Sequence, residues 1–170
     1  MTEKPEPSRS GMPVITRLGE DDWRAWREVR LAALADAPGA FGTTLEAEEY
    51  LGEGEWRAKI RGAGIFIAAA GASPVGAAAG IPRGSAAECG LGAMWVAPVW
   101  RGTGVAAMLA GAVIGWAREE GYVRVGLWVP ADDARACRFY ERQGFRAAGR
   151  SRPFPADAAR SISEMILDLG

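Results

Sequence analysis

The stretch from Met94 to Ala107, which reads MWVAPVWRGTGVAA, decides how the chain is organised. It begins as an apolar strand, is interrupted by Pro98, and turns through Arg101-Gly102-Thr103-Gly104 into a helix. Glycine has no Cβ, so the backbone N–H groups of this turn can approach a ligand closely. They also lie at a helix N-terminus, where N–H groups lack helical partners and the helix dipole is positive. The stretch therefore predicts a site for an anionic phosphate group, to which Arg101 can add donors.

The composition excludes several classes of function. The 170 residues are 49% hydrophobic and carry a net charge of −1, which argues against a binder of nucleic acid or of an anionic membrane. No apolar run approaches the ~20 residues needed to cross a bilayer, and the N-terminus lacks an apolar signal core. Histidine is absent, which excludes Ser-His and Cys-His catalysis, and no metal site is expected. Cys89 and Cys137 are interpreted as free thiols in a reducing cytoplasm.

The chain in order predicts a disordered tail over residues 1–12 and a single domain over residues 13–170. Asp132 is the expected N-cap of the last helix, and residues 152–157 are expected to form a proline-stiffened loop. Strands are expected over residues 13–18, 65–70, 75–81, 86–97, 123–129, 145–150 and 162–169, and helices over 20–37, 45–61 with a break at its glycines, 105–120 and 134–142. This order predicts a mixed α/β sheet.

Two motifs make the chain similar to one known family. Arg101-Gly102-Thr103-Gly104-Val105-Ala106 resembles the acetyl-CoA signature Arg/Gln-x-x-Gly-x-Gly/Ala of the GNAT superfamily of N-acetyltransferases. The segment from Asp133 to Phe145 resembles the family's Asn-x-x-Ala-x-x-x-Tyr-x-x-x-Gly-Phe segment, with Asp133 standing where Asn is usual. The resemblance covers residues 14–169 and is weakest before residue 65. It implies an α/β fold with a mixed, mostly antiparallel sheet that is flanked by helices and whose splayed central parallel strands admit the cofactor.

The resemblance also implies where acetyl-CoA would bind. The strand edge of Met94, Trp95 and Val96 would hold the pantetheine arm by backbone hydrogen bonds, and the N–H of Val96 would support an oxyanion. Asp133 and Ala136 would lie beside the pantetheine, with Asp133 acting through its backbone or a water because it lacks the amide donor of Asn. The pyrophosphate would be held by Arg101, Gly102, Thr103, Gly104, Val105 and Ala106.

Tyr140 is the residue to which the resemblance assigns the general acid for the CoA thiolate. Helical spacing places it on one face with Asp133 and Ala136. A phenol of pKa ~10 can donate a proton to a thiolate whose acid has a pKa of ~8.5. A core-facing tyrosine with a satisfied hydroxyl is the alternative.

Glu88 is the candidate general base, because some GNAT enzymes use a Glu on the strand that here runs to Val96. An exposed charge at a strand end is the alternative reading. Glu46, Glu48 and Glu49 could instead line an acceptor pocket, although such a run is usually a solvated helix face.

Aromatic side chains are candidates for the wall of the acceptor pocket, although core packing is the default for any one of them. The proline-stiffened segment 152–157 resembles the loop that some small-molecule GNAT enzymes place over the acceptor, and a plain connecting loop is equally consistent. The candidate wall residues are Phe41, Trp95, Trp128 and Phe154.

These features predict a cytoplasmic N-acetyltransferase, compatible with a homodimer, that moves the acetyl group of acetyl-CoA to the primary amine of a small molecule. A CoA-binding module without catalysis and an acetyltransferase for protein N-termini remain open alternatives. A dinucleotide-binding fold also fits Gly102-x-Gly104-x-x-Ala107. That fold expects its fingerprint in the first strand-turn-helix unit, whereas three strands are expected before this one.

Overall fold

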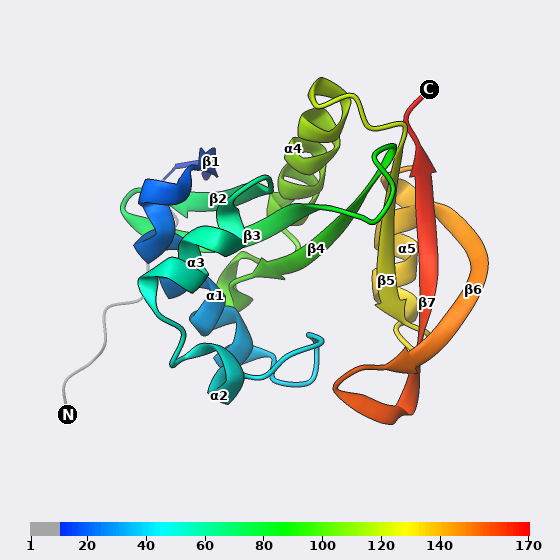
Figure 1. Cartoon of the computed structure of the whole chain (residues 1–170), viewed down its shortest axis with the longest axis horizontal. Helices are drawn as coiled ribbons and strands as arrows, with labels where there is room; N and C mark the ends of the chain where they lie inside the picture. The colour runs from blue at the N-terminus through cyan, green and yellow to red at the C-terminus, as the bar shows by residue number, and fades with distance from the viewer. Residues whose placement is uncertain (1–10) are drawn as a thin grey trace.

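The computed structural model describes residues 11–170, so most of the tail expected over residues 1–12 lies outside the described part. One seven-stranded sheet and five α-helices account for most of these residues (Figure 1). The strands are β1 (Val14–Leu18), β2 (Gly64–Ala70), β3 (Ser73–Pro82), β4 (Glu88–Val96), β5 (Arg124–Pro130), β6 (Arg146–Phe154) and β7 (Asp157–Asp168). The helices are α1 (Trp23–Asp36), α2 (Leu45–Glu48), α3 (Glu53–Ile60), α4 (Val105–Glu119) and α5 (Ala134–Arg142), with 3-10 turns η1 (Glu20–Asp22) and η2 (Pro98–Trp100).

Two local expectations from the sequence are wrong. The segment 152–157 is no open loop, because β6 runs to Phe154, β7 begins at Asp157, and these two residues pair across a tight hairpin. The N-cap of α5 is Asp133, whose carboxylate accepts a hydrogen bond from the Ala136 N–H at 2.9 Å. Asp132 lies one residue too early to reach that N–H and instead faces Arg160 at 3.5 Å.

The central strands of the sheet diverge after a short contact. The strand order is β1-β2-β3-β4-β5-β7-β6, and only the β4–β5 pair is parallel among the described strands. That pairing is restricted to Glu88–Gly90 against Arg124–Gly126. Figure 1 shows β4 and β5 together at one end and turned away from each other at the other. The predicted mixed, mostly antiparallel sheet with splayed central strands is confirmed.

A bulge in β4 explains the divergence. Ala77 of β3 pairs with Trp95, but Ala79 pairs with Gly92, so two residues of β4 oppose one of β3. The bulge includes Ala93, which adopts a left-handed backbone with φ 52°. A bulge bends its strand and increases the local twist, which turns the far end of β4 away from β5.

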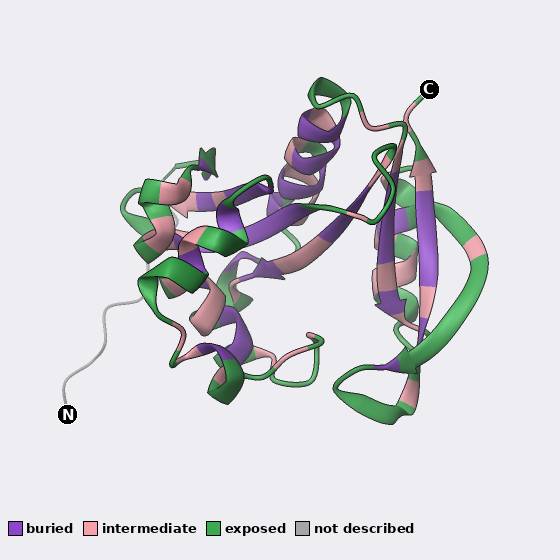
Figure 2. Cartoon of the chain, in the orientation of Figure 1, coloured by how far each residue is buried: buried purple, intermediate pink, exposed green. Residues whose placement is uncertain are grey.

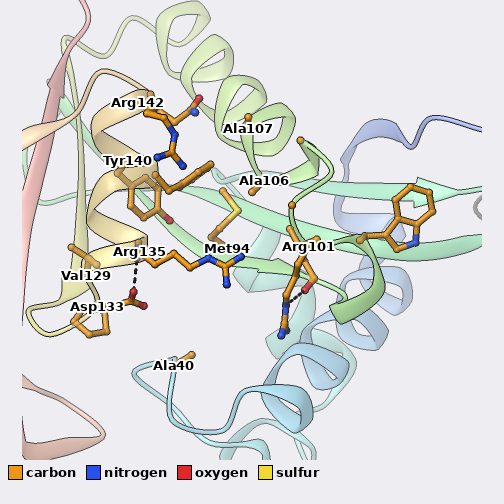
Figure 3. Close-up of a pocket in the computed structure, with 18 residues that line it drawn as sticks. Ala40, Met94, Arg101, Ala106, Ala107, Val129, Asp133, Arg135, Tyr140 and Arg142 are labelled. Carbon is orange, nitrogen blue, oxygen red and sulfur yellow. Dashed lines mark hydrogen bonds between the residues drawn. The ribbon is translucent and has the colours of Figure 1, made fainter.

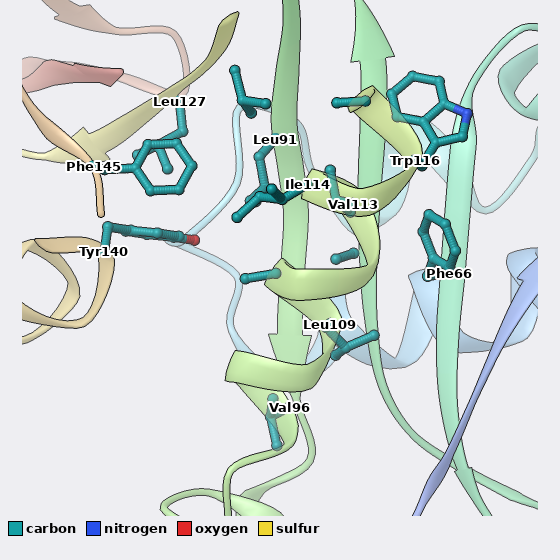
Figure 4. Packing of buried hydrophobic residues seen from close by; sticks show 14 of the residues in the cluster. Phe66, Leu91, Val96, Leu109, Val113, Ile114, Trp116, Leu127, Tyr140 and Phe145 are labelled. Carbon is teal, nitrogen blue, oxygen red and sulfur yellow. The ribbon is translucent and has the colours of Figure 1, made fainter. Parts of the chain in front are cut away.

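The two faces of the sheet carry separate cores because successive strand residues point to opposite sides. On one face, α4 and α5 cover an apolar cluster that includes Leu91, Leu127 and Phe145 (Figure 4). On the other face, α1 and α3 pack against β2, β3 and β4 through Trp26, Trp56, Ile65 and Trp95. Figure 2 shows that β6, at one sheet edge, is mostly exposed. None of the helices formed by residues 11–170 is both long enough and apolar enough to span a membrane.

The Trp116 side chain of α4 packs closely against Gly80 of β3, which leads to a prediction about stability. A Cβ added at Gly80 would lie 2.3 Å from a Trp116 ring carbon, so Gly80→Ala forces the buried indole out of place. We expect the free energy of unfolding to fall by about 2 kcal/mol or more, the scale of overpacked cores. Urea denaturation measures it. Gly111→Ala is the control, because a Cβ there meets no atom within 4 Å and alanine favours a helix; an equal loss in both variants would contradict the packing argument.

Candidate active site

A cavity of about 630 Å³ lies where β4 and β5 have separated, between the start of α4 and α5 (Figure 3). Its walls come from segments in several parts of the chain. They are Ala40 of the loop after α1, the end of β4, the glycine turn that leads into the first turn of α4, the end of β5 and the inner face of α5. The divergence of the central strands is therefore what creates the cavity.

The glycine turn offers an anion site at one end of the cavity. Gly102 and Gly104 adopt left-handed backbones with φ 76° and 92°, and a Cβ added at either would meet no atom within 4 Å. The Thr103 hydroxyl donates to the carbonyl of Trp100 and so holds the turn closed. The first helical bond to the turn runs from the Met108 N–H to the Gly104 carbonyl at 3.1 Å, which leaves the preceding N–H groups of the helix for a ligand.

At the end of β4, the backbone N–H group of Val96 faces the gap between β4 and β5. The Ala97 N–H donates to the Val75 carbonyl of β3 at 2.8 Å. Backbone groups alternate along a strand, so those of Val96 point to the opposite edge, and the Val96 carbonyl indeed accepts from Arg101 instead of β3 at 3.0 Å. The Val96 N–H therefore faces the gap. The neighbouring Met94 side chain lines the cavity.

The expected role of Trp95 at the pantetheine edge is not supported, because Trp95 pairs with Ala77 of β3 and its backbone groups alternate with those of Val96, so they point to β3. The Trp95 ring is 8% exposed and belongs to the core under α1 and α3, on the opposite face of the sheet. The indole Nε1–H donates to the Asp36 carboxylate at 2.9 Å. Core packing, the alternative considered for this aromatic residue, accounts for the side chain.

Arg101 has partners other than the expected phosphate. Its Nε donates to the Val96 carbonyl, and its Nη2 pairs with the carboxylate of Asp36 at the end of α1. The guanidinium thus ties the end of β4 to the end of α1. Arg101 still lines the cavity, but the backbone N–H groups of the turn are the donors there that no side-chain contact engages.

Tyr140 is held with its hydroxyl toward the cavity. The residue is 9% exposed, and its ring packs edge-on against Phe139 and Phe145, with centroid distances of 4.9 and 5.7 Å (Figures 3 and 4). Burial, and to a lesser degree the Asp133 carboxylate, raises the pKa of this phenol well above its ordinary value. The hydroxyl therefore keeps its proton at neutral and moderately alkaline pH.

Glu88 is not brought together with Tyr140. It sits in the first β4–β5 pair, where its carboxylate is 3.0 Å from Arg124, and it does not line the cavity. Along β4 it lies about 20 Å from Met94 at the usual rise per residue. The structure therefore gives the proposed base no geometric support.

Glu46, Glu48 and Glu49, the acidic residues considered for the acceptor pocket, do not line the cavity. Glu48 is buried and accepts two hydrogen bonds from Arg30 at 3.2 and 3.1 Å, with Lys59 at 3.7 Å. This clamp ties α2 to α1 and α3.

Phe41 and Phe154 lie on two segments that meet across the opening. Arg160 of β7 donates to the Gly39 carbonyl at 3.2 Å and stacks over the Phe154 ring at 5.4 Å. A Cβ on Gly42 would come within 3.9 Å of Pro155, so the loop after α1 touches the β6–β7 hairpin. Neither phenylalanine lines the cavity itself, and neither does Trp128.

Two arginines of the cavity wall are not predicted by the sequence motifs. Arg135 and Arg142 line it from α5, together with Phe139, and their side chains are directed into it (Figure 3). Their positions are four and three residues from Phe139, so helical periodicity from the α5 motif could have found them. Two guanidinium groups opposite the glycine turn make this end of the cavity suited to a polyphosphate.

Comparison with known proteins identifies the family. A model of the acetyltransferase (GNAT) family matches residues 19–145. The chain belongs to the GNAT family. Among curated proteins, none matches the sequence.

Solved structures show the same fold at low sequence identity. A putative acetyltransferase from Salmonella typhimurium with its cofactor acetyl-CoA is 17% identical, with a TM-score of 0.74 over 94% of this chain and 95% of that one. A GNAT acetyltransferase from Streptococcus pneumoniae is 15% identical, with a TM-score of 0.76 over 93% and 99%. The ribosomal-protein-S18-alanine N-acetyltransferase from Escherichia coli is 20% identical, with a TM-score of 0.67 over 94% and 95%.

Asp133 stands where the family motif has Asn, and its role as the N-cap of α5 predicts the effect of substituting it. Asp133→Asn should leave stability nearly unchanged, because asparagine caps a helix as well as aspartate does. Asp133→Ala should lower the free energy of unfolding by about 1 kcal/mol, since the Ala136 N–H loses its acceptor. Denaturant unfolding distinguishes the two. Equal stability of the alanine and asparagine variants would show that the cap contributes nothing.

Proposed function

We propose that this GNAT protein transfers the acetyl group of acetyl-CoA to the primary amine of a small molecule. The observation that carries the proposal is the cavity between β4 and β5, with the glycine turn at one end and the Tyr140 hydroxyl in its wall. The acetyl-CoA that accompanies the Salmonella relative supports the choice of donor.

The residues around the cavity fit acetyl-CoA. In the proposal, the N–H groups of Val105 and Ala106 hold the pyrophosphate, since the left-handed glycines leave open space beside them. Arg135 and Arg142 add positive charge from the opposite wall. The free β4 edge at Met94 and Val96 receives the pantetheine amides. Bound there, acetyl-CoA supplies an acetyl group activated as a thioester.

Two groups of the chain would then act on the reaction. The Val96 N–H faces the gap and would stabilise negative charge on the carbonyl oxygen. The amine would attack the thioester carbon. As the C–S bond breaks, the Tyr140 hydroxyl, which keeps its proton to high pH, would give it to the departing sulfur, and the proton lost by the nitrogen would restore the phenol. Asp133 is the one carboxylate of the described cavity wall, and it is engaged as a helix cap. We therefore propose that the amine binds as the free base, without Glu88.

The contact between the α1 loop and the β6–β7 hairpin favours a small acceptor. Arg160 bridges Gly39 and Asp132 across this side of the molecule, and Pro155 lies against Gly42. A protein N-terminus needs an open groove at this place. The buried Tyr140 hydroxyl, in turn, favours catalysis over a module that only binds CoA.

Gly104→Glu tests the pyrophosphate assignment. The substitution brings a side chain and a negative charge beside the proposed phosphate position, so acetyl-CoA binding should become undetectable by calorimetry. Gly111→Glu is the matched control, because it adds the same charge to the exposed side of the same helix. Gly104→Ala measures the cost of the left-handed backbone alone. Unchanged affinity in a folded Gly104→Glu variant would contradict the assignment.

Tyr140→Phe tests the transfer itself, measured as thiol release from acetyl-CoA over a panel of amines and N-terminal peptides. The variant keeps the ring but loses the proton, so turnover should fall by about 100-fold or more, with little change in acetyl-CoA affinity. Because the Tyr140 pKa is raised, wild-type turnover should show no decline near pH ~10, where ordinary tyrosines ionise.

Tyr122→Phe is the control, because Tyr122 packs against Trp116, away from the cavity. Normal turnover in Tyr140→Phe would remove the general acid from the proposal. Thiol release with peptides alone would replace the small-molecule acceptor by a protein N-terminus. If none of the amines or peptides gave thiol release, the CoA-binding module would be favoured.

A further inference from the structure

Glu164 is a buried carboxylate that the proposed reaction does not use. It lies on β7 and is 1% exposed, yet it accepts hydrogen bonds from Arg83 Nη1 at 2.7 Å and from Arg150 Nε. Burial alone would raise the pKa of this carboxyl, but the bonds from Arg83 and Arg150 outweigh burial and leave the pKa below its usual range. Glu164 is therefore ionised at neutral pH and holds two guanidinium groups in place.

Strand alternation places this group on the sheet face opposite α4 and α5. Val125 and Leu127 belong to the core under those helices, so Gly126 between them points the other way. By the same argument Glu164 points away from its neighbour Met165. On this face α1 and α3 pack over β2, β3 and β4, and no comparable helix packing reaches β5 or β7 among the described residues.

Arg83 occupies the closed end of the gap between β4 and β5. A Cβ on Gly126 would lie 2.5 Å from Arg83 Nη1, and one on Gly90 would lie 3.1 Å from Nε, so the guanidinium rests on these two glycines. Gly90 and Gly126 form the last residue pair before the strands diverge. The Arg83 side chain is 25% exposed, and Glu164 is the one side-chain acceptor that it has among residues 11–170. Its other N–H groups are left for a ligand.

The charges at this end of the face do not balance. Arg152 stacks over the Trp128 ring at 4.3 Å, and within the described part of the chain no hydrogen bond or ion pair occupies its guanidinium. Trp128 pairs in register with Glu164, so Arg152 lies beside the same rung. We call Glu164, Arg83, Arg150 and Arg152 the Glu164 cluster. It contains three arginines and one carboxylate, whereas the far end of the face pairs Arg124 and Arg146 with Glu88 and Asp168.

We propose that the Glu164 cluster binds a carboxylate of the acceptor, so the acceptor is an amine that also carries a carboxylate. The inference rests on the proposed acetyl transfer. The cavity with Tyr140 lies against α4 and α5 on one side of the sheet, and the cluster lies on the other side, beside the last β4–β5 pair. An amine that enters from the cluster side reaches the gap with its anionic group over Arg83. A guanidinium fork fits a carboxylate with two parallel hydrogen bonds, which sets the distance from anion to amine.

The members of the cluster have different tasks. Arg83 and Arg152 hold the acceptor carboxylate, because both have donors without a protein partner in residues 11–170. Glu164 is a positioning residue that orients Arg83 across the two glycines. Trp128 keeps Arg152 flat against the sheet.

The experiment compares acids with their neutral isosteres. Thiol release from acetyl-CoA is measured with α- and ω-amino acids and with the corresponding carboxamides, and rates are expressed per free amine. The wild type should use at least one acid about 10-fold better than its amide in kcat/KM. Arg83→Gln should raise KM for that acid by about 10- to 100-fold, the scale of hydrogen bonds to charged groups, with a smaller change in kcat and little change for the amide.

Two further variants keep the test decisive. Arg152→Gln should fold even if Arg83→Gln does not, because its guanidinium supports no buried group. It should raise KM for the acid because Arg152 is proposed to hold the carboxylate. Arg146→Gln, on the same face but paired with Asp168, should leave both substrates unaffected. Equal use of acids and amides by the wild type would overturn the carboxylate subsite and leave acetyl transfer intact. Absence of thiol release with every amine would overturn the proposed transfer and, with it, this inference.

Discussion

The structure depends on the short contact between β4 and β5, which ends after the pair of Gly90 and Gly126. Past that point, two strands inside one sheet have facing edges that do not bond to each other. Backbone N–H and C=O groups seldom stay unpaired away from water, so the gap needs either solvent or a ligand with amide groups of its own. The bulge at Ala93 keeps the gap open, and α4 and α5 wall it on one side. The site is thus a consequence of interrupted pairing in the sheet.

Contacts made by arginine side chains, in place of continuous strand pairing, connect the two halves of the molecule across the gap. Arg83 reaches from the β3–β4 connection to Glu164 on β7 at the closed end. Arg160 of β7 reaches the Gly39 carbonyl in the loop after α1 at the open end. A buried ion pair adds little stability by itself, because desolvation offsets the attraction between the charges. The directional geometry of the Arg83–Glu164 pair, however, sets the spacing between the two halves. In the proposal, the remaining N–H donors of the arginines at this end also make it selective for anions.

Sequence reasoning predicted what local patterns determine. The glycine turn, the helix after it and the bounds of α5 follow from the residues at those positions, and the family motif located Tyr140. Contacts between distant residues could not be predicted. Arg101 suits a phosphate in the motif, but Asp36 at the end of α1 engages it. Glu88 is on the expected strand, yet the β4–β5 register pairs it with Arg124. The pairing of Arg83 with Glu164 depends on sheet order, which spacing along the chain does not reveal.

Hydrogen exchange with and without acetyl-CoA reports which backbone N–H groups the ligand engages, and so locates the donor site. Slower exchange is expected at Met94 and Val96 at the end of β4 and in the turn from Gly102 to Ala107. Strands β3 and β7, which lie beside β4 and β5 on the sides away from the gap, and the outer helix α3 should exchange at unchanged rates. Protection confined to α1 and α3, or no protection of the β4 edge at saturating acetyl-CoA, would contradict the claim that the opening between β4 and β5 is the donor site.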